Sequence, residues 1–181
     1  MNSEKLKHDQ LVEKAKRWLL ADNCTLVLTE LVTGGMFRES PDAWGWNTGK
    51  NCSMLVECKA SRADFRSDLK NKWFRNPRFH FGMGAYRWYL APMGMLHEKE
   101  LPKGWGLLEV QPTGGVVQKV ESQRFKWSAQ REIGFLTSAI RRFHLPDLGV
   151  GLRAYSAKMY GKPSDNPKAT LTVESTEERE P

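Results

Sequence analysis

Residues 42–73 contain the pattern that most restricts how this chain can fold. Two strand-like apolar runs, 42–47 and 52–59, are separated by Thr48-Gly49-Lys50-Asn51, a four-residue sequence of turn formers. A helix-like segment begins directly after the second run, at Ser61, and continues to about residue 73. This order predicts a β-hairpin whose second strand leads straight into a helix.

The remainder of the chain supplies further strands and helices around this hairpin. We expect a helix over 3–21 and a helix from Ser128, with strands over 25–32, 85–91, 105–110 and 116–120. The order α-β-β-β-α-β-β-β-α predicts an α/β fold, with a mixed sheet flanked by helices.

Length and composition favour one domain. The chain has 181 residues, enough for one core, so we expect a single domain over residues 1–160. Residues 161–181 are rich in Pro, Ser, Thr and Glu, which predicts a disordered acidic tail. The charged N-terminal segment lacks the apolar centre of a signal peptide, and no run of 18 apolar residues occurs. The expectation is a cytoplasmic protein with no membrane partner.

The charge balance points to a polyanionic partner. Lys and Arg number 28 against 21 for Asp and Glu, a net charge of +7. The segment 165–181 is net −3, so the rest of the chain carries +10. A body this basic favours nucleic acid as the partner; charge that serves solubility alone is the alternative.

The predicted hairpin brings two acidic residues together. If residues 48–51 form the loop, Asn47 faces Cys52, and the same register places Asp42 directly opposite Glu57. Their Cβ atoms would then be about 4.5–5.5 Å apart. Two carboxylates this close repel each other, so a neighbouring cation has to compensate.

Two cations are candidates for that role. Lys59 lies two residues beyond Glu57 and projects from the same face of the strand. A bound Mg²⁺ or Mn²⁺ also fits, because both ions prefer oxygen ligands, and the backbone carbonyl of Cys58 would add one. Such a site is typical of a metal-dependent phosphodiesterase. A purely structural Asp–Lys–Glu cluster on a solvated sheet face is the alternative.

A basic segment follows the candidate site. Residues 59–87 hold eight basic and two acidic side chains, a net charge of +6. Four aromatic residues, Trp73, Phe74, Phe79 and Phe81, are interleaved among them. Positive charge for phosphates with rings for bases is typical of a nucleic-acid groove; rings that belong to the core are the alternative. The candidate DNA contacts are Arg62, Lys70, Lys72, Arg75, Arg78 and Arg87.

These residues resemble a known family. Pro41-Asp42 followed by Glu57-Cys58-Lys59 resembles the motif of the PD-(D/E)XK nuclease superfamily. The run Val56-Glu57-Cys58-Lys59-Ala60-Ser61-Arg62-Ala63-Asp64-Phe65 is similar to the branch that contains the MmcB-like DNA repair proteins and related phage nuclease-like proteins. Segments 86–92 and 101–108 also resemble that branch, and the likeness covers about residues 25–120.

The resemblance implies a restriction-endonuclease-like α-β-β-β-α-β core and Mg²⁺-dependent cleavage of DNA in repair, recombination or phage DNA processing. Asp42 and Glu57 would be metal ligands and Lys59 the catalytic lysine. Glu30, expected on the preceding strand, would match an upstream acid that binds a metal or its water; an ordinary exposed strand acid is the alternative. Ser61 and Arg62 would position the sheet end or a phosphate.

Several alternatives stay open at this stage. A nuclease-like fold that binds DNA or a protein without cutting would carry the same motif. The DNA could be single-stranded, duplex or branched, the protein a monomer or a homodimer, and the cell a bacterium or a phage-infected host. The histidines have no ligand spacing; His80 could contact phosphate, while His8, His97 and His144 are expected to be surface residues. Trp44 and Trp46 would either line the site or pack in the core.

Overall fold

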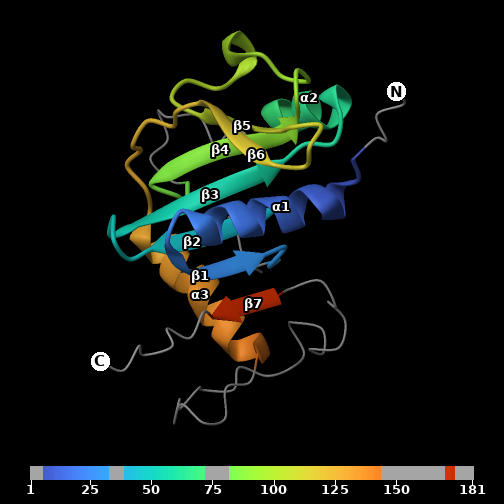
Figure 1. Cartoon of the computed structure of the whole chain (residues 1–181). Helices are drawn as coiled ribbons and strands as arrows, with labels where there is room; N and C mark the ends of the chain where they lie inside the picture. The colour runs from blue at the N-terminus through green and yellow to red at the C-terminus, as the bar shows by residue number, and fades with distance from the viewer. Residues whose placement is uncertain (1–5, 33–38, 72–81, 144–169, 174–181) are drawn as a thin grey trace.

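A mixed sheet of seven strands forms the middle layer of the computed structural model, which describes residues 6–32, 39–71, 82–143 and 170–173 (Figure 1). The elements are α1 (His8–Ala21), β1 (Cys24–Thr29), β2 (Ala43–Asn47), β3 (Cys52–Cys58), α2 (Arg62–Asn71), β4 (Tyr86–Pro92), the 3-10 turn η2 (Glu98–Glu100), β5 (Gly106–Val110), β6 (Val116–Val120), α3 (Ala129–Phe143) and β7 (Thr170–Val173). The spatial order of the strands is β6-β5-β4-β3-β2-β1-β7.

The sheet combines two kinds of pairing. Strands β1, β2 and β3 pair antiparallel, as β5 does with β6 and β1 with β7. Strands β3, β4 and β5 run parallel to one another. The carboxyl ends of β3, β4 and β5 therefore meet at one edge of the sheet, where ligands of open α/β sheets commonly bind.

Helix α1 covers one face of the sheet. Its buried residues Leu11, Val12, Ala15 and Leu19 recur at helical spacing. They pack against apolar side chains of the central strands, among them Val56 and Leu90. Every residue of β3 is buried, which is expected of a central strand covered by helices on both faces.

Helices α2 and α3 contribute to the core on the opposite face. Phe65 of α2 and Phe135 of α3 belong to a second apolar cluster that includes Leu55 and Tyr89. Trp44 is also part of this cluster, fully buried, with its ring centroid 5.7 Å from that of Phe135. Helices thus flank a mixed sheet on both faces, and the predicted α/β fold class is confirmed. The open choice for Trp44 is settled in favour of the core.

Two sequence-based expectations need correction. Glu30 is not on a strand, because β1 ends at Thr29 and Glu30 adopts a left-handed backbone with φ of 49°. Residues 161–181 were expected to be disordered throughout, but Thr170–Val173 form β7 and pair with β1. The sequence Thr-Leu-Thr-Val is rich in β-branched residues, and it pairs with an otherwise open sheet edge.

The three cysteines, Cys24, Cys52 and Cys58, are free and buried. No helix within the described residues has both the length and the apolar character needed to cross a bilayer.

Candidate active site

The β2–β3 hairpin places Asp42 and Glu57 side by side. Asn47 pairs with Cys52 and Ala43 with Val56, the register expected from the sequence. Continuing this register by one pair puts Asp42 opposite Glu57. Asp42 Oδ2 accepts a hydrogen bond from the backbone N–H of Cys58 at 2.7 Å, which holds its carboxylate over the end of β3.

The row of side chains continues onto the next strand. Glu57 pairs in register with Tyr89 of β4, so Asp42, Glu57 and Tyr89 occupy neighbouring positions on one face of the sheet. Glu57 is 0% exposed. A carboxylate without solvent needs a counter-charge and hydrogen bonds inside the protein.

Lys59 supplies that counter-charge. Its Nζ lies 3.5 Å from Glu57 Oε2 and 3.1 Å from Asp68 Oδ1 of α2. Asp68 Oδ2 in turn accepts a hydrogen bond from the Tyr89 hydroxyl at 2.9 Å. The backbone N–H of Lys59 donates to the carbonyl of Leu90, which extends the β3–β4 pairing past Cys58 and fixes the lysine at the sheet edge.

His8 and Glu30 complete the surroundings of Asp42. His8 Nε2, in the first turn of α1, lies 3.5 Å from Asp42 Oδ1 and 3.8 Å from Glu30 Oε1. The backbone N–H of Glu30 donates to the Asp42 carbonyl at 3.0 Å. Glu30 therefore lies beside Asp42, and it extends from a left-handed turn rather than from the strand on which it was expected.

The electrostatics of the cluster show an excess of negative charge around Asp42. Burial and the neighbouring Glu57 raise the pKa of Asp42 from 3.8 to about 7, against the opposing effects of Lys59, the Cys58 N–H and His8. Burial alone would lower the pKa of Lys59, but Glu57, Asp68 and Asp42 outweigh it and raise that pKa. Lys59 is therefore an ammonium ion at neutral pH, and one lysine does not fully stabilise the ionised acids.

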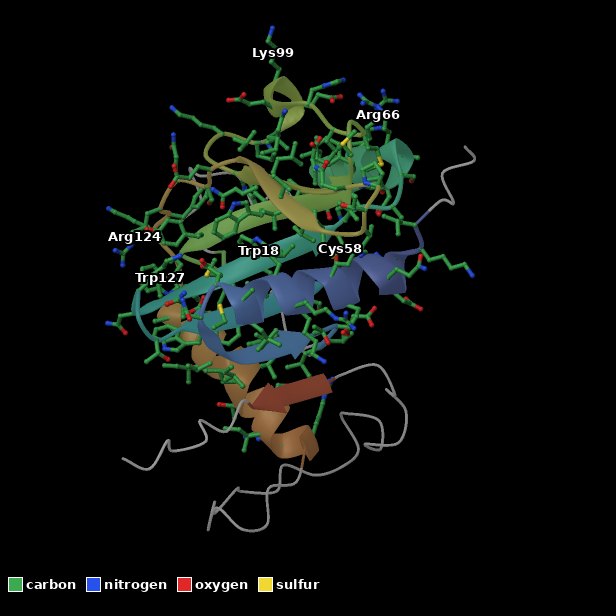
Figure 2. The ribbon with its side chains drawn as sticks, viewed as in Figure 1. Trp18, Cys58, Arg66, Lys99, Arg124 and Trp127 are labelled. Carbon is green, nitrogen blue, oxygen red and sulfur yellow. The ribbon has the colours of Figure 1, made fainter. Side chains whose placement is uncertain are left out.

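The donor set fits a hard divalent cation with water ligands. Within the described part of the chain, no group of three or more His, Cys, Asp and Glu side chains is arranged to hold a metal ion. Mg²⁺, however, is commonly bound through one or two carboxylates and keeps several waters. In an extended strand the N–H and C=O of one residue point to the same side. The N–H of Cys58 points toward Asp42, so its carbonyl also faces β2. Cys58 lies near the arrowhead of β3 (Figure 2).

The predicted nucleic-acid contacts have different surroundings. Arg62 donates to the Met95 carbonyl and pairs with Glu100, and Ser61 Oγ accepts from the backbone N–H of Asp64, so both stabilise the start of α2. Lys70 is exposed on α2, where Arg66 also points outward (Figure 2). Lys72, Arg75 and Arg78, with His80 and the four aromatic residues of that segment, lie outside the described residues.

The predicted DNA contact of Arg87 is wrong. Arg87 is 3% exposed, its Nε donates to the Gly84 carbonyl, and its guanidinium lies 4.5 Å from the ring centroid of Phe125. It sits on a strand that helices cover on both faces, so its charge is used inside the fold.

Sequence reasoning missed three residues of the cluster: His8, Asp68 and Tyr89. His8 was expected to be a surface residue, and nothing local in the sequence indicates that α1 delivers it to Asp42. Asp68 carries a readable signal, because it follows the buried Phe65 by three residues and therefore shares the inward face of α2. Tyr89 required the parallel β3–β4 register.

Comparison with protein-family models and with curated proteins finds no match. Among solved structures, the chain is similar to the SPO1766 protein of unknown function from Silicibacter pomeroyi, with a TM-score of 0.56 and 23% sequence identity. The match covers 83% of this chain and 99% of that chain. At this identity the likeness shows a shared fold alone.

Proposed function

We propose that this chain is a Mg²⁺- or Mn²⁺-dependent nuclease that hydrolyses phosphodiester bonds of DNA in repair, recombination or phage DNA processing. The observation that carries the proposal is the acid cluster at the end of the β2–β3 hairpin: Asp42, directly before β2, is close enough to Glu57 of β3 for the two carboxylates to repel each other, and the Lys59 ammonium lies 3.5 Å from Glu57. The same three residues form the motif that resembles the PD-(D/E)XK nucleases.

The residues that would hold the ion are Asp42 and Glu57, with the Cys58 carbonyl as a third oxygen and Glu30 close by. A bound divalent ion would supply a Lewis acid that withdraws charge from the phosphate and acidifies a neighbouring water. It would also offset the burial and the repulsion by Glu57 that together raise the pKa of Asp42.

Lys59 acts through its charge in this mechanism. Its raised pKa keeps it protonated at neutral pH, so it is a hydrogen-bond donor and not a proton acceptor. The ammonium would hold a phosphate oxygen and stabilise the negative charge that develops there. The attacking water releases one proton to solvent as its oxygen forms the new bond to phosphorus; the bond to the leaving sugar oxygen breaks, and that oxygen takes a proton from solvent.

The basic composition of the chain supports DNA as the substrate. Lys70 and Arg66 are exposed on α2, the helix that contributes Asp68 to the cluster. Arg62 lies at the start of the same helix and is partly exposed, although Glu100 engages it. Positive charge beside the carboxylates would bind the phosphate backbone without reading base sequence.

The test is cleavage of single-stranded, duplex and branched DNA by the purified chain with Mg²⁺ or Mn²⁺. We expect the wild type to cut at least one substrate and Asp42→Asn, Glu57→Gln and Lys59→Met to lose this activity by at least about a hundredfold. Asp64→Asn is the matched control, since it removes an exposed acid from α2. Equal cleavage by wild type and the Lys59 variant would refute the catalytic role.

A second candidate function is a catalytically silent module that binds DNA or a protein. The complete burial of Glu57 and its pairing with Lys59 favour it, because both features would also stabilise a purely structural cluster. A salt-dependent gel shift, with every DNA substrate left intact in Mg²⁺ and Mn²⁺, would support this function over the nuclease.

A further inference from the structure

Asp68 is a buried acid outside the motif that suggests the nuclease. Its side chain is 4% exposed, and it faces the sheet from α2, one turn after the buried Phe65. Burying a carboxylate costs several kcal/mol unless charge and hydrogen bonds compensate it inside the protein. The position of Asp68 on α2 does not by itself explain what compensates its buried charge.

Both oxygens of Asp68 have a defined partner. Oδ1 lies 3.1 Å from Lys59 Nζ, and Oδ2 accepts the Tyr89 hydroxyl at 2.9 Å. The Tyr89 ring is fixed in turn by Phe65, edge-on at 5.0 Å between centroids, and by Trp105, stacked at 4.6 Å. The Asp68 carboxylate is thus held in one orientation and aimed at the lysine.

This arrangement divides Lys59 between two acids with different roles. Glu57 and Asp42 are the candidate metal ligands, whereas Asp68 belongs to the opposite side of the lysine. When the Glu57 carboxylate binds a divalent ion, Asp68 remains as the counter-ion of Lys59. Without the Asp68 charge, the ammonium would draw closer to Glu57 and compete with the ion for the same oxygens.

We propose that Asp68, oriented by Tyr89, is a positioning residue that holds Lys59 away from the carboxylates and so keeps them available for a divalent cation. This inference rests on the proposed function, since it assigns Asp68 a task at the same site. It predicts that Asp68 affects metal binding through Lys59 and not through the ion itself.

The experiment is a double-mutant cycle on the full chain, read as Mn²⁺ affinity by isothermal titration calorimetry without DNA. We expect Asp68→Asn to weaken Mn²⁺ binding about tenfold, the lower end of the effect of outer residues on metal sites. The same substitution in a Lys59→Met background should leave Mn²⁺ affinity unchanged within about twofold, because no ammonium remains to compete. An equal loss in both backgrounds would overturn the inference.

Two further variants keep the test decisive. Tyr89→Phe removes only the hydroxyl that orients Asp68, so it should weaken Mn²⁺ binding in the same direction by about threefold, even if Asp68→Asn folds poorly. Asp64→Asn, which removes an exposed acid of the same helix, should leave Mn²⁺ binding unchanged. If Tyr89→Phe and Asp68→Asn both bind Mn²⁺ as tightly as the wild type, Asp68 has no positioning role.

The failure of this inference is distinguishable from the failure of the proposed function. If the wild type binds no Mn²⁺ and cuts no DNA, both the nuclease proposal and the role of Asp68 fall. If the wild type binds Mn²⁺ and cuts DNA but the Asp68 and Tyr89 variants match it in affinity, only the role of Asp68 is refuted.

Discussion

The imidazole of His8 lies 3.5 Å from the carboxylate of Asp42, although 34 positions separate the two residues in the chain. Helix α1 makes this contact at its first turn, while the remainder of its inward face packs on the sheet. The layer that covers the sheet thus also supplies a side chain to the candidate site. The contact connects the packing of α1 to the electrostatics of the acid pair.

Replacing His8 with Ala should separate activity from stability. His8 is 38% exposed, and surface ion pairs contribute less than about 1 kcal/mol, so the melting temperature should change little. Cleavage of DNA should fall about tenfold, because the Asp42 and Glu30 carboxylates lose the imidazole between them. The measurement is a single-turnover cleavage rate beside a thermal melt; a large drop in melting temperature with normal cleavage would contradict it.

The raised pKa of Asp42 predicts that the free energy of unfolding decreases as pH rises. An acid whose pKa is about 7 in the folded state and 3.8 in the unfolded state binds its proton more tightly when folded. The unfolding free energy that it contributes therefore falls as pH rises from about 4 to about 7, by roughly 2–4 kcal/mol. Asp42→Asn removes this loss, so the variant should gain stability over the wild type as pH rises.

Urea unfolding of both proteins at pH 4.5 and pH 8, with EDTA present, measures that difference. The Asp42→Asn variant should be more stable than the wild type at pH 8 and close to it at pH 4.5. A stability difference that stays constant across this range would show that Asp42 is already ionised at low pH in the folded protein.

Divalent ions should restore the stability that is lost when Asp42 ionises. A ligand that binds only the folded state stabilises it by about 2.7 kcal/mol at a hundred times its dissociation constant. Mg²⁺ or Mn²⁺ should therefore raise the melting temperature of the wild type at pH 8, and less at pH 5, where protons compete for Asp42. Glu57→Gln should abolish the rise, and Asp64→Asn should preserve it. A rise of equal size in Glu57→Gln would place the ion elsewhere.

Arg87 and Lys70 should behave oppositely when replaced by Ala. Arg87 is buried and bonded to the Gly84 carbonyl, so its loss should cost about 2–4 kcal/mol of stability. Lys70 is exposed, so Lys70→Ala should leave the melt unchanged, weaken DNA binding and reduce the salt dependence of that binding by about one unit of slope. Urea unfolding and salt-titrated fluorescence anisotropy measure the two effects.

Two glycines should respond to Ala in opposite directions. A Cβ on Gly106 would meet the Trp88 ring and the Val120 carbonyl, so Gly106→Ala should destabilise the sheet by at least about 2 kcal/mol. A Cβ on Gly134, within α3, would meet nothing within 4 Å, so Gly134→Ala should stabilise the protein by about 0.5–1 kcal/mol. Chemical unfolding curves of the pair test both; a neutral Gly106→Ala would mean that Trp88 moves easily.

Local patterns predicted the hairpin well because the number of residues in a short loop determines which residues of the two strands pair. The four residues between the strands fix the partner of Asn47, and with it every pair as far as Ala43. The helix after Lys59 followed from its capping residue Ser61, whose hydroxyl accepts the Asp64 N–H. These features depend on neighbours in the chain, which the sequence displays.

The remaining features depend on contacts between distant segments. His8 reaches Asp42 only after α1 packs across the sheet, and Tyr89 reaches Asp68 only once β4 pairs parallel with β3. Arg87 lies in a basic segment that resembles a DNA-binding surface, yet its strand enters the centre of the sheet. Charge counted along a sequence does not tell which cations the fold buries.

The β2–β3 register has a consequence for how the protein could be assayed. Because side chains alternate along a strand, a shift of the β2–β3 register by one residue would turn the Asp42 side chain to the face covered by α1. Glu57 would then no longer lie opposite Asp42. A molecule with its hairpin mispaired could keep much of its secondary structure and still lack the acid pair. Under the nuclease proposal, the fraction of molecules that turn over substrate would therefore equal the fraction whose hairpin has the correct register. Active-site titration would then detect a misfolded population that circular dichroism would miss.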